Sequence, residues 1–212
     1  MKINIFLFLI FFNFTFIFFS QETYAEYKII DAPHCINNKG EEVKFQNMKS
    51  NNSKITLGIA KKDGEGKPII YRFNYNHSSK PLQMFIDYHE CAHHQTGDLD
   101  KPHPPQNSFE HLMKESIADC IAAIRIKADN INGRVFIKKA LLELKKAMKY
   151  IGFDKSTIKS REDNILNCFN KKISLSTYIE NIIKKEFWYK ILILIWINIC
   201  LIFIKLYIYK FC

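Results

Sequence analysis

The chain has 212 residues and a formal net charge of +10. This length suits one domain with appended segments, and it is long enough to bury a sizeable core. The basic excess does not indicate a nucleic-acid-binding protein, because the lysines are not interleaved with stacking aromatic residues in the pattern of any such module. We interpret the charge as a solvated helix face in preference to attraction to anionic lipid or an acidic partner.

Residues 1–25 are predicted to be a secretory signal peptide. The opening "MKINIFLFLIFFNFTFIFFS" has one early lysine and then an almost unbroken apolar and aromatic run without an acidic residue, and "TYA" ends at Ala25 as a small-residue cleavage site. The run is longer than a typical signal core, so an uncleaved N-terminal anchor is the alternative. In either case we expect an exported protein at a periplasmic or extracellular face.

Cysteine usage fits export. Cys200 lies in a C-terminal apolar block and Cys212 ends the chain, which leaves four cysteines for the folded body: Cys35, Cys91, Cys120 and Cys168. In an oxidising compartment, two disulfides are expected in preference to four free thiols. Four cysteines allow three pairings, and the sequence does not choose among them, although a bridge from Cys120 to Cys168 is plausible.

The predicted domain spans residues 26–186, and its first half favours short strands. Three segments have strand character, and they are "EEVKFQNM" (41–48), "KITLGIA" (54–60) and "IIYRFNYN" (69–76). The last two flank "KKDGEGKP", which has the composition of a turn. We therefore predict an α+β fold that begins with a short antiparallel sheet.

The second half of the domain favours helices. One helix is predicted from a cap at Ser79 to a left-handed end at Gly97, and a proline-rich loop follows it. Ser108 caps a second helix over residues 109–128, and a third is predicted over residues 134–151 because apolar residues recur there at helical spacing. Residues 153–172 are too weakly patterned to predict an element.

Residues 187–212 are predicted to be a transmembrane or membrane-anchoring tail. The stretch 191–204 is apolar except for Asn198, and the block reaches the ~20 residues of a spanning helix if Lys205 snorkels to the headgroups. A buried core helix would normally show a polar face, which this block lacks. Lysines flank both ends, so the orientation stays open.

Three of the seven histidines fall within "HECAHH", residues 89–94. His89 and His93 are four residues apart, so they lie on one face of the predicted helix, one turn from each other. Both imidazoles can then reach a single zinc ion at about 2.0–2.1 Å. Glu90 lies beside the same face, where its carboxylate could hold a water bound to that metal. The pattern is H-E-x-x-H.

The second predicted helix offers a third ligand. A catalytic zinc takes three protein ligands and keeps a fourth position open for water. Glu115 and Asp119 are four apart and share a face of this helix. If the two helices pack face to face, one carboxylate can reach the metal while the other holds a ligand histidine by its second ring nitrogen.

H-E-x-x-H followed by E-x-x-x-D on the next helix resembles the gluzincin branch of zinc metallopeptidases, the thermolysin-like and related groups. The resemblance covers residues 85–125 and implies a zincin-like fold in which the segment 69–76 lends its edge to an extended peptide. It implies that His89, His93 and Glu115 are the zinc ligands. It also implies that Glu90 is the general base and that Asp119 is the partner that holds His89. The family's further transition-state donor, a histidine or tyrosine farther along the chain, is not assigned by the sequence, and Tyr150 and Tyr178 are no more than candidates for it.

The other histidines and Cys91 are weaker candidates for the metal site. His94 lies about 100° round the helix from the preceding histidine and is expected to point to solvent or to pack laterally. His111 shares a helix face with the carboxylate ligand, which makes it a rival ligand or a site-lining group. His103 could line the mouth of the cleft. Cys91 should face the core and serve packing or a disulfide.

Three hypotheses follow for the function. The resemblance implies an exported, membrane-associated zinc peptidase that hydrolyses a peptide or protein substrate by a metal-bound water, with Glu90 as general base. The second is a catalytically inactive zinc-binding module at the membrane. The third is a basic, membrane-anchored helical protein without a metal, in which the histidine cluster is a solvated face. The sequence does not indicate the substrate.

Overall fold

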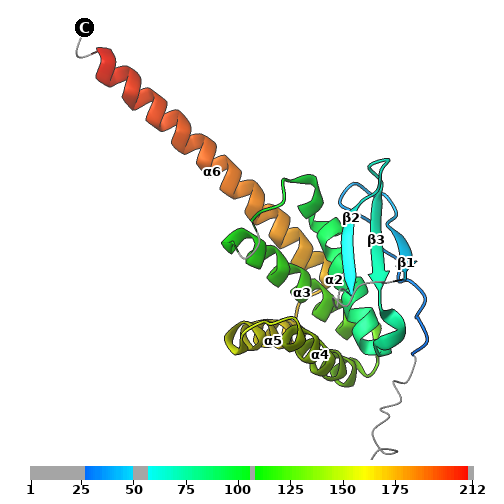
Figure 1. Ribbon diagram of the computed structural model, residues 1–212. Helices are drawn as coiled ribbons and strands as arrows, with labels where there is room; N and C mark the ends of the chain where they lie inside the picture. The colour runs from blue at the N-terminus through cyan, green and yellow to red at the C-terminus, as the bar shows by residue number, and fades with distance from the viewer. Residues whose placement is uncertain (1–26, 50–56, 106–107, 210–212) are drawn as a thin grey trace, which may run out of the picture.

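The computed structural model describes residues 27–49, 57–105 and 108–209, so the predicted signal peptide over residues 1–25 and Cys212 lie outside the described residues. Within this part the chain forms one three-stranded sheet and five α-helices, which confirms the α+β class. Figure 1 shows the sheet at one side of the molecule, the helices beside it, and the C-terminal helix projecting beyond both.

The sheet is mixed, with the strand order β1-β3-β2. β2 (Gly58–Lys62) pairs antiparallel with β3 (Pro68–Phe73), while β1 (Lys44–Met48) pairs parallel with β3 on its other side. The prediction of an antiparallel sheet is therefore wrong for β1. A tight turn joins β2 to β3, with Gly66 in the left-handed conformation at φ 80°.

The position of β3 also corrects the expected peptide-binding edge. β3 has a hydrogen-bonded neighbour on each side, so residues 69–76 cannot lend an edge to a peptide. They include the end of the strand and a short 3-10 helix, η1 (Tyr75–His77). β2 is the edge strand on the side of the sheet that faces the histidine helix, because its backbone contacts a side chain of that helix.

The two motif-bearing helices begin and end where the sequence predicts. α2 (Lys80–Thr96) follows Ser79 and ends at Gly97, which has φ 73° and leads into the 3-10 helix η2 (Asp98–Asp100). α3 (Phe109–Asp129) is capped by Ser108, whose side chain accepts a hydrogen bond from a backbone N–H of the first turn. α2 and α3 pack against each other through small and branched side chains, including Ala92, Ala118 and Ile121.

α5 (Lys155–Asn170) occurs where the sequence predicts no element. Its start is determined locally, since Asp154 accepts hydrogen bonds from the backbone N–H groups of Ser156 and Thr157. Its apolar face is narrow, which explains the weak periodicity, and it consists of the buried residues Ile165, Cys168 and Phe169. This helix packs against α3 and against α4 (Gly133–Tyr150), the third predicted helix.

Two disulfides tie these elements together. Cys120–Cys168 joins α3 to α5, which confirms the pairing that the sequence makes plausible, and Cys35–Cys91 joins the N-terminal segment to α2. Cys91 therefore faces the core, as expected. The two bridges close loops of 48 and 56 residues, and constraints of that length on the unfolded chain stabilise a fold by about 4 kcal/mol each in the chain-entropy account.

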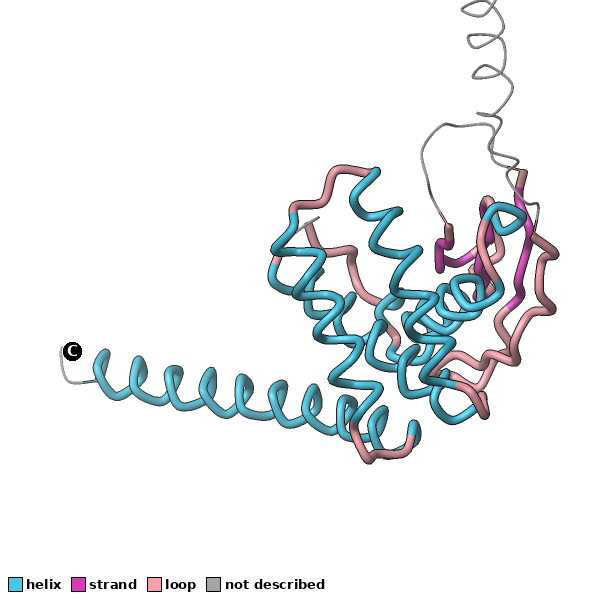
Figure 2. The backbone as a smooth tube through the Cα atoms, turned by 90° about the horizontal axis from the view of Figure 1, so that it is seen from below, coloured by secondary structure: helices cyan, strands magenta, loops and turns pink. Residues whose placement is uncertain are grey.

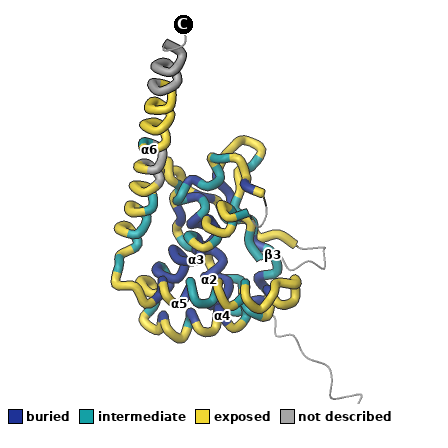
Figure 3. Tube along the Cα trace, turned by 90° about the vertical axis from the view of Figure 1, so that its left-hand side faces the viewer, coloured by how far each residue is buried: buried dark blue, intermediate teal, exposed yellow. Residues whose placement is uncertain are grey.

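A buried ion pair fixes α2 over the sheet. Arg72 of β3 donates from Nε to Asp87 Oδ1 at 2.9 Å and from Nη2 to Asp87 Oδ2 at 2.5 Å, and the hydroxyl of Tyr75 donates to the same carboxylate at 2.9 Å. The larger apolar core lies between α2, α3, α4 and α5, visible as buried residues in the interior in Figure 3. The ion pair on one side of α2 and the apolar core on the other therefore hold this helix in place independently of its histidines.

α6 (Leu175–Tyr209) is one continuous helix across the predicted boundary between residues 186 and 187. Its first turns pack on α2 and α3 through Tyr178, Ile179 and Ile182, and the helix then leaves the rest of the molecule (Figures 1 and 2). The predicted C-terminal hydrophobic helix is therefore present, although it starts earlier than expected.

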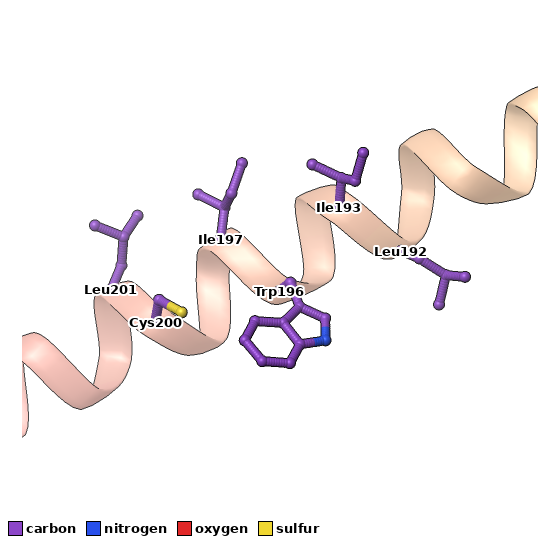
Figure 4. A pocket seen from close by; sticks show the side chains of 6 residues that line it. All are labelled: Leu192, Ile193, Trp196, Ile197, Cys200 and Leu201. Carbon is purple, nitrogen blue, oxygen red and sulfur yellow. The ribbon is translucent and has the colours of Figure 1, made fainter. Parts of the chain in front are cut away.

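Apolar side chains of α6 are exposed from Leu192 to Leu201. Figure 4 shows a hollow lined by six of them, all on this one helix: Leu192, Ile193, Trp196, Ile197, Cys200 and Leu201. Within the residues that the structure describes, no helix combines the length and apolarity needed to cross a membrane.

Candidate metal centre

Three side chains from α2 and α3 converge on one point. His89 Nε2 lies 3.3 Å from His93 Nε2 and 3.3 Å from Glu115 Oε2, and His93 Nε2 lies 3.5 Å from Glu115 Oε1. Ligand atoms arranged as a tetrahedron at 2.0–2.1 Å from zinc stand about 3.3 Å from one another. Each imidazole nitrogen therefore lies at about the ligand spacing of a metal site from the other nitrogen and from one of the two oxygens of Glu115, and the three residues form a group that could hold a metal ion.

The electrostatics of the cluster fit a cation at its centre. Burial by itself would lower the pKa of His89, but the neighbouring Asp119 and Glu115 carboxylates raise it to about 9. Burial likewise opposes the effect of Asp98 and Glu115 on His93, whose pKa rises to about 10. Burial would raise the pKa of Glu115, yet the two imidazoles hold it well below its usual range. The carboxylates thus favour a positive charge at this position. A bound divalent cation can supply that charge as well as protonated imidazoles can.

Each histidine has an acidic residue behind it. Asp119 is 1% exposed, and its Oδ1 lies 2.9 Å from His89 Nδ1, the contact that the sequence predicts. Asp98 Oδ2 lies 3.1 Å from His93 Nδ1, and the sequence analysis did not identify this residue. These contacts hold Nε2 of both rings toward the centre. Asp98 directly follows Gly97, the residue at which α2 ends. The predicted end of the helix could therefore have indicated that Asp98 lies close to His93.

Arg161 is a second residue that the sequence analysis missed. It reaches from α5 to Asp119, with Nε 2.6 Å from Oδ2 and Nη2 2.9 Å from Oδ1, and its Nη2 lies 3.8 Å from Glu115 Oε2. Burial would raise the pKa of Asp119, but Arg161 and His89 keep it below its usual value. Arg161, Asp119 and His89 thus form a chain of charged contacts that ends at the metal centre.

Glu90 lies between the metal centre and the edge strand β2. The backbone N–H of Ala60 donates to Glu90 Oε2 at 2.8 Å. A Cβ atom at Gly58 would stand 2.6 Å from Ile86 Cγ2 and 2.7 Å from Glu90 Cγ, so the strand can pass this close to α2 only with glycine at that position. The carboxylate is therefore held in one place beside the cluster.

A cleft of about 610 Å³ opens over the cluster, a volume within the range of ligand-binding sites. β2 forms one wall, and the loop after α2 and the start of α3 form the other. The cleft is lined by Gly58, Ile59, Ala60, Lys61, Lys62, His89, Glu90, His93, Asp98, Leu99, Lys101, His103, Pro104, His111, Lys114 and Glu115.

The remaining candidates separate into two groups. His103 and His111 line the cleft, with ring centroids 5.9 Å apart, as the prediction of site-lining groups requires. His94 is buried, and its Nε2 lies 3.1 Å from the carbonyl oxygen of Ile69, so it packs laterally and does not face solvent. Tyr150 is 70% exposed, and Tyr178 packs between α6 and the helices beneath it, so neither lines the cleft.

No protein-family model, curated protein or solved structure matches this chain. The gluzincin resemblance therefore rests on the residue pattern alone. What the site can do follows from its own donor atoms, its neighbouring carboxylates and the cleft above it.

Proposed function

We propose that this protein is a zinc-dependent peptidase with a zincin-like arrangement of its site. One observation carries the proposal: two imidazole nitrogens stand 3.3 Å apart, each lies 3.3 or 3.5 Å from an oxygen of the Glu115 carboxylate, and all three residues line an open cleft together with Glu90. Two histidines and one carboxylate are a donor set that suits zinc and leaves an open position for catalysis.

The side chains around the cluster have separable roles. Zinc held by His89, His93 and Glu115 would supply a Lewis acid that acidifies a water and polarises a peptide carbonyl. Glu90 takes the proton of the attacking water and passes it to the leaving amine, and its hydrogen bond from Ala60 keeps the carboxylate in position for both transfers. The contacts of Asp119 and Asp98 hold the two imidazoles in orientation.

β2 is the element that would receive a peptide substrate. It is an edge strand, and all five of its residues, Gly58–Lys62, line the cleft. An edge strand offers backbone groups to which an extended peptide can add as a further strand, although on β2 the N–H of Ala60 is already bonded to Glu90. This geometry supports a peptide or protein as the substrate, and in the proposed complex the peptide backbone lies alongside Glu90.

Two further observations support the proposed location. The disulfides Cys35–Cys91 and Cys120–Cys168 favour an oxidising compartment and therefore export. The exposed apolar stretch of α6 between Leu192 and Leu201 supports association with a membrane, since soluble proteins rarely expose apolar surface of this extent.

A zinc-binding module without catalysis is the second candidate. Its support is that neither candidate for a transition-state donor, Tyr150 or Tyr178, is among the residues that line the cleft. The two candidates make the same prediction for metal binding and opposite predictions for hydrolysis.

Hydrolysis of a fluorogenic peptide library by the full chain tests the proposal. We expect cleavage by the zinc-loaded protein, its loss on treatment with 1,10-phenanthroline, and its return when zinc is added back. Bound zinc without cleavage of any peptide would select the inactive module. Absence of both zinc and cleavage would leave the metal-free helical protein.

A further inference from the structure

The walls of the cleft are basic beyond the metal centre. Among the described lining residues, the three acidic ones are Glu90, Asp98 and Glu115, and each already serves the metal centre. The basic lining residues are Lys61, Lys62, Lys101, His103, His111 and Lys114. Since the acidic residues contact the metal centre and the basic ones lie around it, a substrate group that carries negative charge is favoured in this part of the cleft.

Lys114 is the most buried of these basic residues. It is 9% exposed, and its Nζ is buried without a hydrogen-bond partner. The nearest carboxylate is Glu110 Oε1 at 3.2 Å, in a contact that lacks hydrogen-bond geometry, and the Glu110 side chain is 57% exposed. Lys62 differs, because it is bound to Asp100 at 2.5 Å. A buried ammonium group with unused donors is costly unless a ligand supplies acceptors.

His111 adds a second unused polar atom beside Lys114. Its Nδ1 is buried and has no hydrogen-bond partner, while its ring stacks on that of His103. His111 and Lys114 are three residues apart on α3 and therefore neighbours on its surface, next to the ligand Glu115. Both residues line the same cleft.

We propose that Lys114 and His111 form a subsite for a carboxylate of the peptide substrate. The inference rests on the proposed function, because it names the substrates of that site: peptides with a carboxylate close to the bond that is cleaved. A carboxylate suits the pair because its oxygens accept hydrogen bonds from both an ammonium group and an imidazole N–H.

The helix geometry limits how far this carboxylate stands from the cleaved bond. From His111 to Glu115 the helix rises by about 6 Å, and an extended peptide advances about 3.3 Å per residue. The carboxylate should therefore lie within about two residues of the cleaved bond. It can be the free C-terminus of a short product segment or the side chain of an aspartate or glutamate.

The test measures binding and does not depend on hydrolysis. The full chain carrying Glu90→Gln is titrated by calorimetry with acetyl-Ala-Ala-Ala as the free acid and as the amide, and with acetyl-Ala-Ala-Asp-amide against acetyl-Ala-Ala-Asn-amide. We expect at least one acid to bind about tenfold more tightly than its neutral partner, the usual effect of a charge-assisted hydrogen bond. Since a carboxylate can also coordinate zinc, the preference must persist after the metal is chelated.

Two variants test whether the preference for the acid over its neutral partner arises at the proposed subsite. Lys114→Gln should reduce the acid-to-amide ratio to within about twofold, and His111→Gln should reduce it in the same direction, with folding checked by circular dichroism. Lys67→Gln is the matched control, because Lys67 pairs with Glu65 in the β2–β3 turn and does not line the cleft. A preference for the first acid identifies a free C-terminus, and a preference for the second identifies an acidic side chain.

Equal binding of acids and neutral partners, no measurable binding of either acid, or an unchanged preference in both variants would overturn the subsite. None of these results bears on whether the protein holds zinc or cleaves peptides, which the library experiment answers separately.

Discussion

The Glu90→Gln variant should retain its zinc and hydrolyse peptides about 10²- to 10⁴-fold more slowly than the wild type, the usual contribution of a general acid–base group. Glutamine has the same shape and can still accept the hydrogen bond from Ala60 N–H through its amide oxygen. Glu90 is also not among the three converging metal-ligand atoms. The substitution thus removes a proton acceptor and leaves the fold and the metal cluster in place.

The measurements for this variant are kcat/KM on one cleaved peptide and zinc content on the same sample. Glu65→Gln is a suitable control, because Glu65 lies in the β2–β3 turn and pairs only with an exposed lysine among the contacts described. Wild-type activity in Glu90→Gln would end the peptidase proposal. Loss of zinc together with activity would instead make Glu90 a ligand.

Asp119→Ala should lower both stability and metal affinity. The substitution leaves the half-buried Arg161 without its bidentate partner, the buried Asp119, and breaking a fully buried pair typically costs about 3–5 kcal/mol of the free energy of unfolding, so this range is the upper bound here. It also removes the contact to His89 Nδ1, and loss of such a contact typically weakens metal binding by about 10- to 100-fold. Urea unfolding and competition with a zinc chelator measure the two effects.

The double variant Asp119→Ala with Arg161→Gln separates the effect on stability from the effect on metal affinity. Removing the unpaired guanidinium should restore part of the stability, while zinc affinity should stay low because His89 still lacks its carboxylate. Asp163→Ala is the control, since its pairing with Lys159 on the exposed side of α5 should be worth less than about 1 kcal/mol. Wild-type zinc affinity in Asp119→Ala would show that Asp119 does not act on the metal.

The convergence of His89, His93 and Glu115 could be predicted because helix geometry alone determines most of it. Four-residue spacing puts both histidines on one face of α2, and the serines at the two N-cap positions locate the helices, although only Ser108 makes the capping hydrogen bond and Ser79 does not. Once two helices with apolar faces pack together, the polar groups at their contact have little freedom. The sequence makes the disulfide between Cys120 and Cys168 only plausible, because it depends on how α5 packs against α3.

Arg161 could not be predicted, because its role depends on how α5 docks. The apolar face of α5 is too narrow to predict the helix, and an arginine in such a segment resembles any solvated side chain. The parallel pairing of β1 was likewise hidden, since alternation within a strand does not reveal which strand lies at the edge. The lysine of the proposed carboxylate subsite is recognisable only from its burial.

Zinc content of the purified full chain, measured by mass spectrometry after equilibrium dialysis against zinc, tests the central claim most directly. The convergent cluster predicts about one zinc per wild-type chain. His93→Ala, which removes one of the three ligands, should lose it, while His77→Ala in the 3-10 helix η1, outside the cleft, should keep it. Less than about a tenth of an equivalent in the wild type under metal-replete conditions, or equal zinc in both variants, would contradict the metal centre.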